Sequence, residues 1–367
     1  MGKWKNWLAN IIDKAEDQWD ELKTTVKTKM NLFDPLEILV FNCYATDNQV
    51  FVFGRVLEHK KNPAPQADDN WLQNFAIAYR RMNSDEVPDA LVQIAFEDKT
   101  YEVSTDEEGY FWFEIPRNGA ALPTHLEVVL LDAPVPHEKN IRTQAELITP
   151  SANAQIAIVS DIDDTILLTG ATSLLDMAKT TFFQNAHTRS TFVGVSPLYQ
   201  ALAKGKTEDA QQPVFYVSSS PWNLHDLLTD FIDINHIPAG NLCLRDYGTD
   251  ENKILMGTHG EHKLMTIYRF LQIYPKLSFV LLGDSGQEDA IIYRTVAKNF
   301  PNRVVAIYIR DAKVEAKKEW MQTQMAEAQK DGIEMLWSEH SLDFAQDAFN
   351  KNLISAQGLE LVKNHKL

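Results

Sequence analysis

The spacing of apolar residues divides the chain into three regions with different periods. In residues 1–32, apolar side chains recur at steps of three and four with Lys, Asp and Glu between them, which predicts one amphipathic helix. Over 33–155 the period falls to two, which is typical of strands with one buried face. Over 156–367, short continuous apolar runs alternate with helical stretches. These periods predict a helical arm, a β-rich domain and an α/β domain, in that order.

The middle region shows two hairpins. Leu36–Ala45 and Gln49–Glu58 flank the turn sequence Thr-Asp-Asn, and a second pair of alternating segments flanks residues 105–109. A further strand is expected over 125–131. Several short antiparallel strands without a convincing long helix predict a small β-sandwich-like domain.

The last region contains four buried runs, at 155–160, 214–218, 277–282 and 304–309. Continuous apolar runs suit strands that are buried on both faces, and the helical stretches between them suit crossover connections. A doubly wound parallel sheet is therefore expected. Polar or charged residues end all four runs. Because ligands of such sheets bind at the carboxyl ends of the strands, we expect the chemistry at that edge.

Composition and charge narrow the function classes. The 367 residues include 51 acidic and 35 basic side chains, a formal net charge of −16, which opposes binding to a nucleic-acid backbone. Two cysteines far apart in the chain suggest neither a disulfide framework nor a metal-binding pair. The first residues lack the apolar run of a signal peptide, and no run reaches 18 apolar residues. The expectation is a cytoplasmic protein.

The clearest chemical signal is the pair Asp161 and Asp163, which follows the buried run at 155–160. In an extended segment, residues two apart point the same way. Two neighbouring carboxylates need a cation or a shared proton, and Mg²⁺ takes such oxygen ligands together with substrate phosphate. An acidic turn in which Asp164 or Thr165 caps a helix would explain the same residues without any chemistry.

Three further signals follow the later runs. Asp284 and Asp289 lie on a glycine-bearing loop, which alone could be a solvated turn. Ser218 precedes Pro221, where hydroxyl and amide groups at a helix start can bind an anion or only cap the helix. Lys263 could neutralise a phosphoryl group, although a lone lysine is usually solvated. Two acidic loops at equivalent strand ends of one domain favour a shared site.

The order of these elements resembles the four-part pattern of the haloacid-dehalogenase-like phosphatases: Asp-x-Asp-x-Thr, a strand-end Ser, a Lys and Gly-Asp-x-x-x-x-Asp. Longer stretches are similar to one branch, the actin-patch-protein type phosphatidate phosphatase family. They are Phe-Tyr-Val-Ser-Ser-Ser-Pro-Trp-Asn (215–223), Leu-Arg-Asp-Tyr-Gly (244–248), His-Lys (262–263), Gly-Asp-Ser-Gly-Gln-Glu-Asp (283–289) and Tyr-Ile-Arg-Asp (308–311). Residues 54–57 and 105–111 are similar to the β domain that precedes the catalytic domain in bacterial members.

This resemblance implies Mg²⁺-dependent hydrolysis of phosphatidate to diacylglycerol and phosphate. Asp161 would attack phosphorus and form an aspartyl-phosphate. Asp163 would protonate the leaving oxygen and then deprotonate the attacking water. Ser218 would hold a phosphoryl oxygen, Lys263 would offset the developing charge, and Thr165 would support the loop.

The same resemblance implies a metal site and a set of substrate contacts. Asp161 and Asp284 would bind Mg²⁺ together with the main-chain carbonyl of Asp163, and Asp289 would orient that shell. Positions that match the branch outside the four shared elements are candidates for substrate binding: Ser219, Trp222, Asn223, Arg245 and Arg310. An ion pair of Arg245 with Asp246 or Asp311 would explain that arginine equally well.

Short intervals between the motif elements leave room for no large lid domain, and only 171–194 could form a small cap. An open site suits a bulky or interfacial substrate such as a lipid. A phosphatase for another bulky phosphomonoester, namely a phosphoprotein, a nucleotide or a lysophospholipid, is the main alternative. A lipid- or partner-binding module is the alternative from another class.

The predicted arm at 1–32 carries three tryptophans, Trp4, Trp7 and Trp19, on its apolar face, with Lys3 and Lys5 near its start. Such a helix could lie on a membrane surface, giving the protein a peripheral location. It could equally pack on the protein's own domains. The mixture of acids and bases on its polar face favours the second interpretation.

Overall fold

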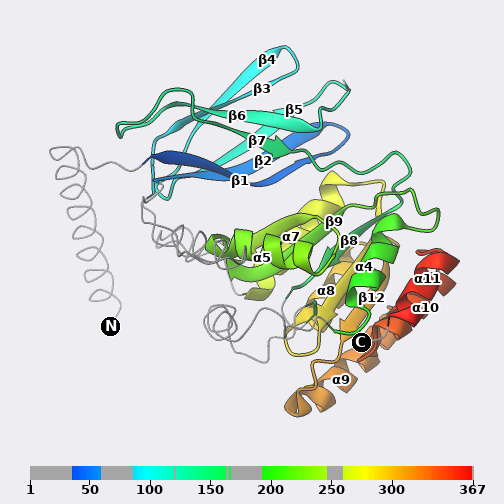
Figure 1. The fold of residues 1–367 in the computed structure, drawn as a ribbon. Helices are drawn as coiled ribbons and strands as arrows, with labels where there is room; N and C mark the ends of the chain where they lie inside the picture. The colour runs from blue at the N-terminus through cyan, green and yellow to red at the C-terminus, as the bar shows by residue number, and fades with distance from the viewer. Residues whose placement is uncertain are drawn as a thin grey trace, which may run out of the picture.

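The computed structural model describes residues 35–58, 86–119, 121–162, 165–166, 192–245 and 259–365 (Figure 1). The predicted arm at 1–32, Asp163 and most of the candidate cap at 171–194 lie outside these residues. Within the described ranges, none of the helices combines the length and the apolar character needed to cross a bilayer.

In its described residues, the β-rich domain contains two antiparallel sheets that share one hydrophobic core. The first sheet has the order β1-β2-β5, with strands β1 (Leu36–Ala45), β2 (Gln49–Glu58) and β5 (Tyr110–Pro116). The second has the order β4-β3-β6-β7, with strands β4 (Lys99–Ser104), β3 (Leu91–Phe96), β6 (His125–Asp132) and β7 (Arg142–Glu146). Alternate residues such as Val92 and Ile94 on β3 point into the core, as the period of two predicts.

The α/β domain is built on a parallel sheet, which in the described part of the chain has six strands. Their order is β10 (Asn241–Arg245), β9 (Val214–Pro221), β8 (Ile156–Ser160), β11 (Ser278–Asp284), β12 (Val304–Arg310) and β13 (Leu336–Ser338). The α-helices between and after these strands are α4 (Val195–Lys204), α5 (His225–Ile234), α7 (His259–Ile273), α8 (Asp289–Asn299), α9 (Lys318–Lys330), α10 (Ser341–Asn350) and α11 (Ala356–Asn364). The predicted α/β class with a parallel sheet is therefore confirmed.

Helices cover both faces of this sheet because its strands are apolar on both faces. Ile156 and Ile158 of β8 pack with α4, α5, α10 and α11, whereas Ala157 and Val159 pack with α7, α8 and α9. Strands β9 and β10 follow one another on one side of β8. The chain then returns to place β11 on the other side of β8, and β12 and β13 follow on that side. The order reverses between β8 and β11, which is where ligands of such sheets bind.

Strand β1 of the first sheet in the β-rich domain packs against the edge strand β10 of the parallel sheet. The Asn42 side-chain amide donates to the Leu242 carbonyl oxygen on β10 (2.7 Å), and the Tyr274 hydroxyl donates to the Ala45 carbonyl oxygen (3.1 Å). Phe41 and Tyr44 extend the cores on opposite faces of the parallel sheet. The two domains thus share hydrophobic cores, and an otherwise open sheet edge is covered.

The last two helices of the described chain are separated by a short break. α10 ends at Asn350 and α11 begins at Ala356. Asn352 has a φ of 58° between them, a left-handed conformation that asparagine tolerates and that no helix continues. Ser355 then caps α11, accepting a hydrogen bond from the Gly358 amide (2.8 Å).

Candidate active site

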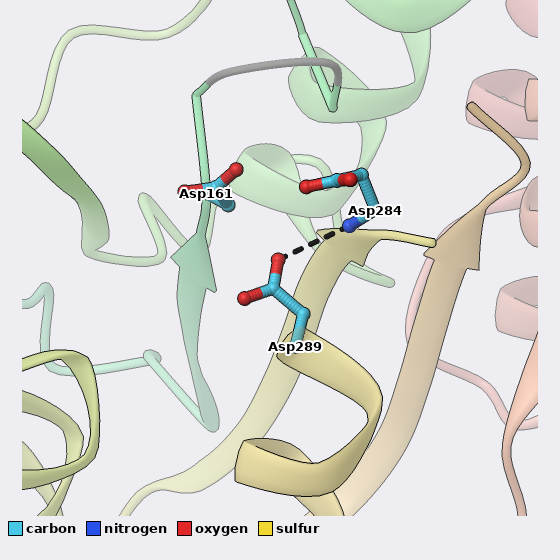
Figure 2. Close-up of side chains that lie close together, drawn as sticks. All are labelled: Asp161, Asp284 and Asp289. Carbon is cyan, nitrogen blue, oxygen red and sulfur yellow. Dashed lines mark hydrogen bonds between the residues drawn. The ribbon is translucent and has the colours of Figure 1, made fainter. Parts of the chain in front are cut away.

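Three buried carboxylates meet at the point where the strand order reverses (Figure 2). Asp161 follows β8, Asp284 ends β11 and Asp289 begins α8. Their exposed fractions are 1%, 0% and 0%. One oxygen from each carboxylate lies within 4.8 Å of the others, so these side chains could hold a metal ion. The structure thus brings together the two acidic loops that the sequence pointed to separately.

The loop after β11 folds back so that its acids face one another. The Asp284 amide donates to Asp289 Oδ2 (3.1 Å), as the dashed line in Figure 2 shows. The amides of Gly286 and Gln287 donate to Asp284 Oδ1 (2.6 and 3.0 Å). Successive amides that point at one carboxylate oxygen fix the orientation of that carboxylate.

Gly283 is required by this fold of the loop. A Cβ at this position would lie 2.3 Å from Asp289 Oδ2, well inside any normal contact distance. We expect Gly283→Ala to displace the Asp289 carboxylate and to lower the free energy of unfolding by about 1–3 kcal/mol. Urea unfolding would measure this loss. Gly260→Ala is the comparison, because its Cβ would approach only the flexible end of the Glu288 side chain (3.1 Å) and would lie at an ordinary contact distance from Ile292.

Lys263 on α7 joins two of the three carboxylates. It is 3% exposed, and its Nζ donates to Asp161 Oδ1 (2.9 Å) and to Asp289 Oδ1. Burial opposes the charge of this ammonium, but the two carboxylates outweigh burial and raise its pKa above the ordinary value. Lys263 is therefore cationic and offsets one of the three negative charges.

Gln287 is a site residue that the sequence did not reveal. Its Nε2 donates to Asp161 Oδ2 (3.2 Å), so both carboxylate oxygens of Asp161 accept hydrogen bonds from neighbouring side chains. Gln287 stands between Asp284 and Asp289 in the sequence, which was the only signal available. Nothing in the pattern shows that this amide turns toward Asp161.

Ser218 lies on β9, the strand beside β8. Because Ser160 is paired with Tyr216, Ser218 stands just past the level of Asp161 at the same sheet edge. Its side chain is fully buried, and its Oγ accepts a hydrogen bond from the Ser220 amide (3.0 Å). Ser219, between them, is half-buried. This position agrees with the expected phosphate-binding role, which stays a prediction.

Arg310 supports the loop after Asp161. Its Nε donates to the Thr165 carbonyl oxygen (3.0 Å), and its Nη1 and Nη2 donate to the Glu339 carbonyl oxygen and Ser341 Oγ (both 3.0 Å). Burial lowers the pKa of Arg310 to about 10, which leaves it charged at neutral pH. The side chain is 2% exposed, and these contacts support a positioning role; substrate contact by Arg310 stays a prediction.

The other substrate-binding candidates lie near Ser218. Trp222 is 8% exposed, and its ring packs against Phe41 of the β-rich domain. Asn223 follows in a 3₁₀ turn, η2 (Trp222–Leu224), and half-buried Arg245 ends β10 opposite Pro221. Substrate contact by these residues stays a prediction, as does the role of Asp163, which lies outside the described residues.

Comparison with known proteins agrees with this geometry. Residues 156–311 match the family described as phosphatidate phosphatase APP1, catalytic domain. The chain is 36% identical over 159 residues to phosphatidate phosphatase APP1 of Saccharomyces cerevisiae, covering 42% of this chain and 26% of that protein. It is 28% identical over 241 residues to an uncharacterized protein of Schizosaccharomyces pombe, covering 60% of this chain and 37% of that protein.

The chain thus spans about a quarter to about a third of the length of these relatives. A carbohydrate acetylesterase from Xanthomonas citri is similar in structure only weakly, with a TM-score of 0.26 and 10% identity over 72% of this chain and 65% of that one. That likeness carries no argument. The family match covers Asp161 after β8, Ser218 on β9, Asp284 at the end of β11 and Asp289 at the start of α8. Residues 156–311 thus form a domain that is similar to the catalytic domain of the APP1-type phosphatidate phosphatases.

Proposed function

We propose that this protein is a Mg²⁺-dependent phosphatidate phosphatase that releases diacylglycerol and phosphate through an aspartyl-phosphate at Asp161. The observation that carries the proposal is the cluster of three buried carboxylates and one lysine at the sheet reversal point. This cluster lies in the domain that is similar to the catalytic domain of the APP1-type phosphatidate phosphatases. The yeast relative is named for the same activity.

The donor set fits a divalent cation. Three buried carboxylates surround one ammonium, so acidic groups outnumber the basic one in this buried cluster, and a divalent cation would offset the excess. Carboxylate oxygens are the ligands that Mg²⁺ prefers. Asp161 and Asp284 would hold the ion with the main-chain carbonyl of Asp163, and Asp289, held by Lys263, would orient them. When bound, the ion would stabilise the phosphoryl charge.

In the first step, a carboxylate oxygen of Asp161 attacks phosphorus, and the bond from phosphorus to the diacylglycerol oxygen breaks. Asp163 gives its proton to that oxygen. The hydrogen bonds that Lys263 and Gln287 donate to Asp161 hold the carboxylate in one orientation before attack. The Ser218 hydroxyl and the Lys263 ammonium stabilise the negative charge on the phosphoryl oxygens.

In the second step, water attacks phosphorus and gives a proton to Asp163. The bond between phosphorus and Asp161 then breaks, phosphate leaves, and both carboxyl groups return to their starting protonation states. Asp163 thus acts as the general acid in the first step and as the general base in the second. Lys263 enters the reaction as a cation, because the Asp161 and Asp289 carboxylates raise its pKa above the ordinary value against the opposing effect of burial.

Dioleoyl phosphatidate in mixed micelles with Mg²⁺ tests the function. We expect release of phosphate, its loss when a chelator removes the metal, and its recovery when Mg²⁺ is added back in excess. A panel of a phosphopeptide, a nucleotide, lysophosphatidate and sugar phosphates separates the alternatives. Turnover of soluble sugar phosphates without turnover of phosphatidate would contradict the lipid substrate, and turnover unaffected by the chelator would contradict the metal requirement.

A further inference from the structure

A β-bulge on β1 lies next to the turn that follows the candidate phosphate-binding strand. Val40 is paired with Gly54 and Asn42 with Phe53, which leaves Phe41 without a partner residue on β2. A bulge of this kind bends a strand and redirects the bulged residue, and bulges recur beside active sites. Gly54 permits the close approach here, because a Cβ at this position would lie 2.2 Å from the Leu39 carbonyl oxygen.

Phe41 contacts the first residue of the η2 turn, Trp222, and the residue that follows the turn, His225. Its ring stacks on the Trp222 ring, with centroids 5.1 Å apart and planes 23° apart. Its carbonyl oxygen accepts a hydrogen bond from His225 Nε2 (2.9 Å). Trp222 begins the turn and His225 begins α5. One residue of the β-rich domain therefore holds both ends of the turn that joins β9 to α5.

A second aromatic side chain reinforces this contact. The Phe53 ring lies 4.7 Å from the Trp222 ring, and Tyr110 stacks on Phe53 with centroids 5.6 Å apart and planes 10° apart. The Arg55 guanidinium lies 4.6 Å from the centre of the Tyr110 ring. Trp222 is thus enclosed by rings from β1 and β2, so a shift of either strand would move it.

The enclosed tryptophan is close in the chain to the candidate phosphate-binding serine. Trp222 comes two residues after Ser220, whose amide donates to Ser218 Oγ. Pro221, between them, is paired with Arg245 of β10. Asn42, the residue next to Phe41, also binds β10 through the Leu242 carbonyl oxygen. Both β9 and β10 are therefore held by adjacent residues of the β1 bulge.

We propose that Phe41 is a positioning residue: through Trp222 and His225 it holds the Ser218–Ser220 segment in the conformation that binds a phosphoryl group. The β-rich domain is then part of the catalytic apparatus and not a separate module. The proposal rests on the proposed function only in taking Ser218 as a phosphate ligand. It predicts that a change in one domain alters phosphate binding in the other.

The test compares Phe41→Ala and the milder Phe41→Leu with wild-type protein. Two quantities are measured: the Kd of inorganic phosphate in the presence of Mg²⁺, by calorimetry, and kcat and KM for phosphatidate. We expect phosphate affinity and kcat each to fall by about ten- to a hundredfold in Phe41→Ala, because small displacements of a positioned group have such effects. Phe41→Tyr, which keeps the ring, should restore both to within about threefold of wild type.

Phe51→Leu is the matched control. Phe51 belongs to the same contact between the domains but lies on the opposite face, where it stacks on Tyr44 (5.0 Å) and lies 5.1 Å from the Arg269 guanidinium. This variant should lower Tm without changing the Kd of phosphate. Equal losses of phosphate affinity in Phe51→Leu and Phe41→Ala would overturn the proposal, as would unchanged affinity in Phe41→Ala.

The phosphate measurement also separates this proposal from the proposed function. A wild-type protein that binds phosphate but does not turn over phosphatidate would refute the lipid activity. The comparison of phosphate affinities among the Phe41 variants would still decide whether Phe41 positions the segment. Thermal melts of every variant report the folded fraction, and affinities are calculated for folded protein only.

Discussion

Asp161→Asn is expected to lower kcat for phosphatidate by about 10⁴-fold or more, because a carboxamide cannot form the aspartyl-phosphate. The replacement is nearly isosteric, and Lys263 keeps its contact with Asp289. We therefore expect the fold to survive. Phosphate release under saturating substrate measures the rate, and acid quenching with ³²P-labelled phosphatidate should trap label on wild-type protein but none on the variant.

Asp331→Asn is the control for this experiment. It removes a carboxylate at the end of α9, where Asp331 pairs with Arg294 (2.6 Å) away from the three-carboxylate cluster. Turnover by this variant should stay within about twofold of wild type, since exposed ion pairs contribute little. If Asp161→Asn retained more than about 1% of wild-type turnover, another group would have to be the nucleophile.

Lys263→Met is expected to lower the free energy of unfolding by about 3–5 kcal/mol in metal-free protein, because it leaves buried carboxylates without their counter-ion. Lys263 is 3% exposed and donates to both Asp161 and Asp289. Urea unfolding in the presence of a chelator measures the loss. Added Mg²⁺ should recover part of it, since a second cation would then compensate the same carboxylates.

Lys276→Met provides the matched comparison. Lys276 also pairs with a carboxylate, that of Asp47 (2.6 Å), but its side chain is 81% exposed and that of Asp47 66% exposed. Its replacement should cost less than about 1 kcal/mol. Equal losses in the two variants would show that burial of the Lys263 contacts does not determine their contribution.

The local elements followed from the spacing of apolar residues where that spacing was strong. β1 and β2 have the predicted bounds, because alternation over ten residues on each side of a turn leaves little freedom in register. Strand β10 was not predicted. Its five residues, Asn241–Arg245, are too few to show a period, and packing against β9 and the β-rich domain makes them a strand.

The acidic residues of the site could be predicted because they also depend on strong apolar runs. Asp161, Asp284 and Asp289 stand at the ends of strong apolar runs or just after them, so their common edge follows from parallel strands. Arg310 was a candidate for substrate contact because it matches the family branch outside the four shared motif elements, and that contact stays a prediction. In the structure its guanidinium contacts the Thr165 and Glu339 carbonyl oxygens, and nothing in its neighbourhood in the sequence shows that direction.

The sequence by itself determined that a β-rich region precedes an α/β region, the α/β class and the four motif elements, since residue type and period are local properties. Tertiary structure alone decided which groups meet. Lys263 and Asp161 are 102 residues apart, and Phe41 and His225 are 184 apart. Such contacts depend on the reversal of strand order and on a one-residue bulge in β1. Neither the reversal nor the bulge produces a periodic pattern of apolar residues, because each arises from how whole elements pack.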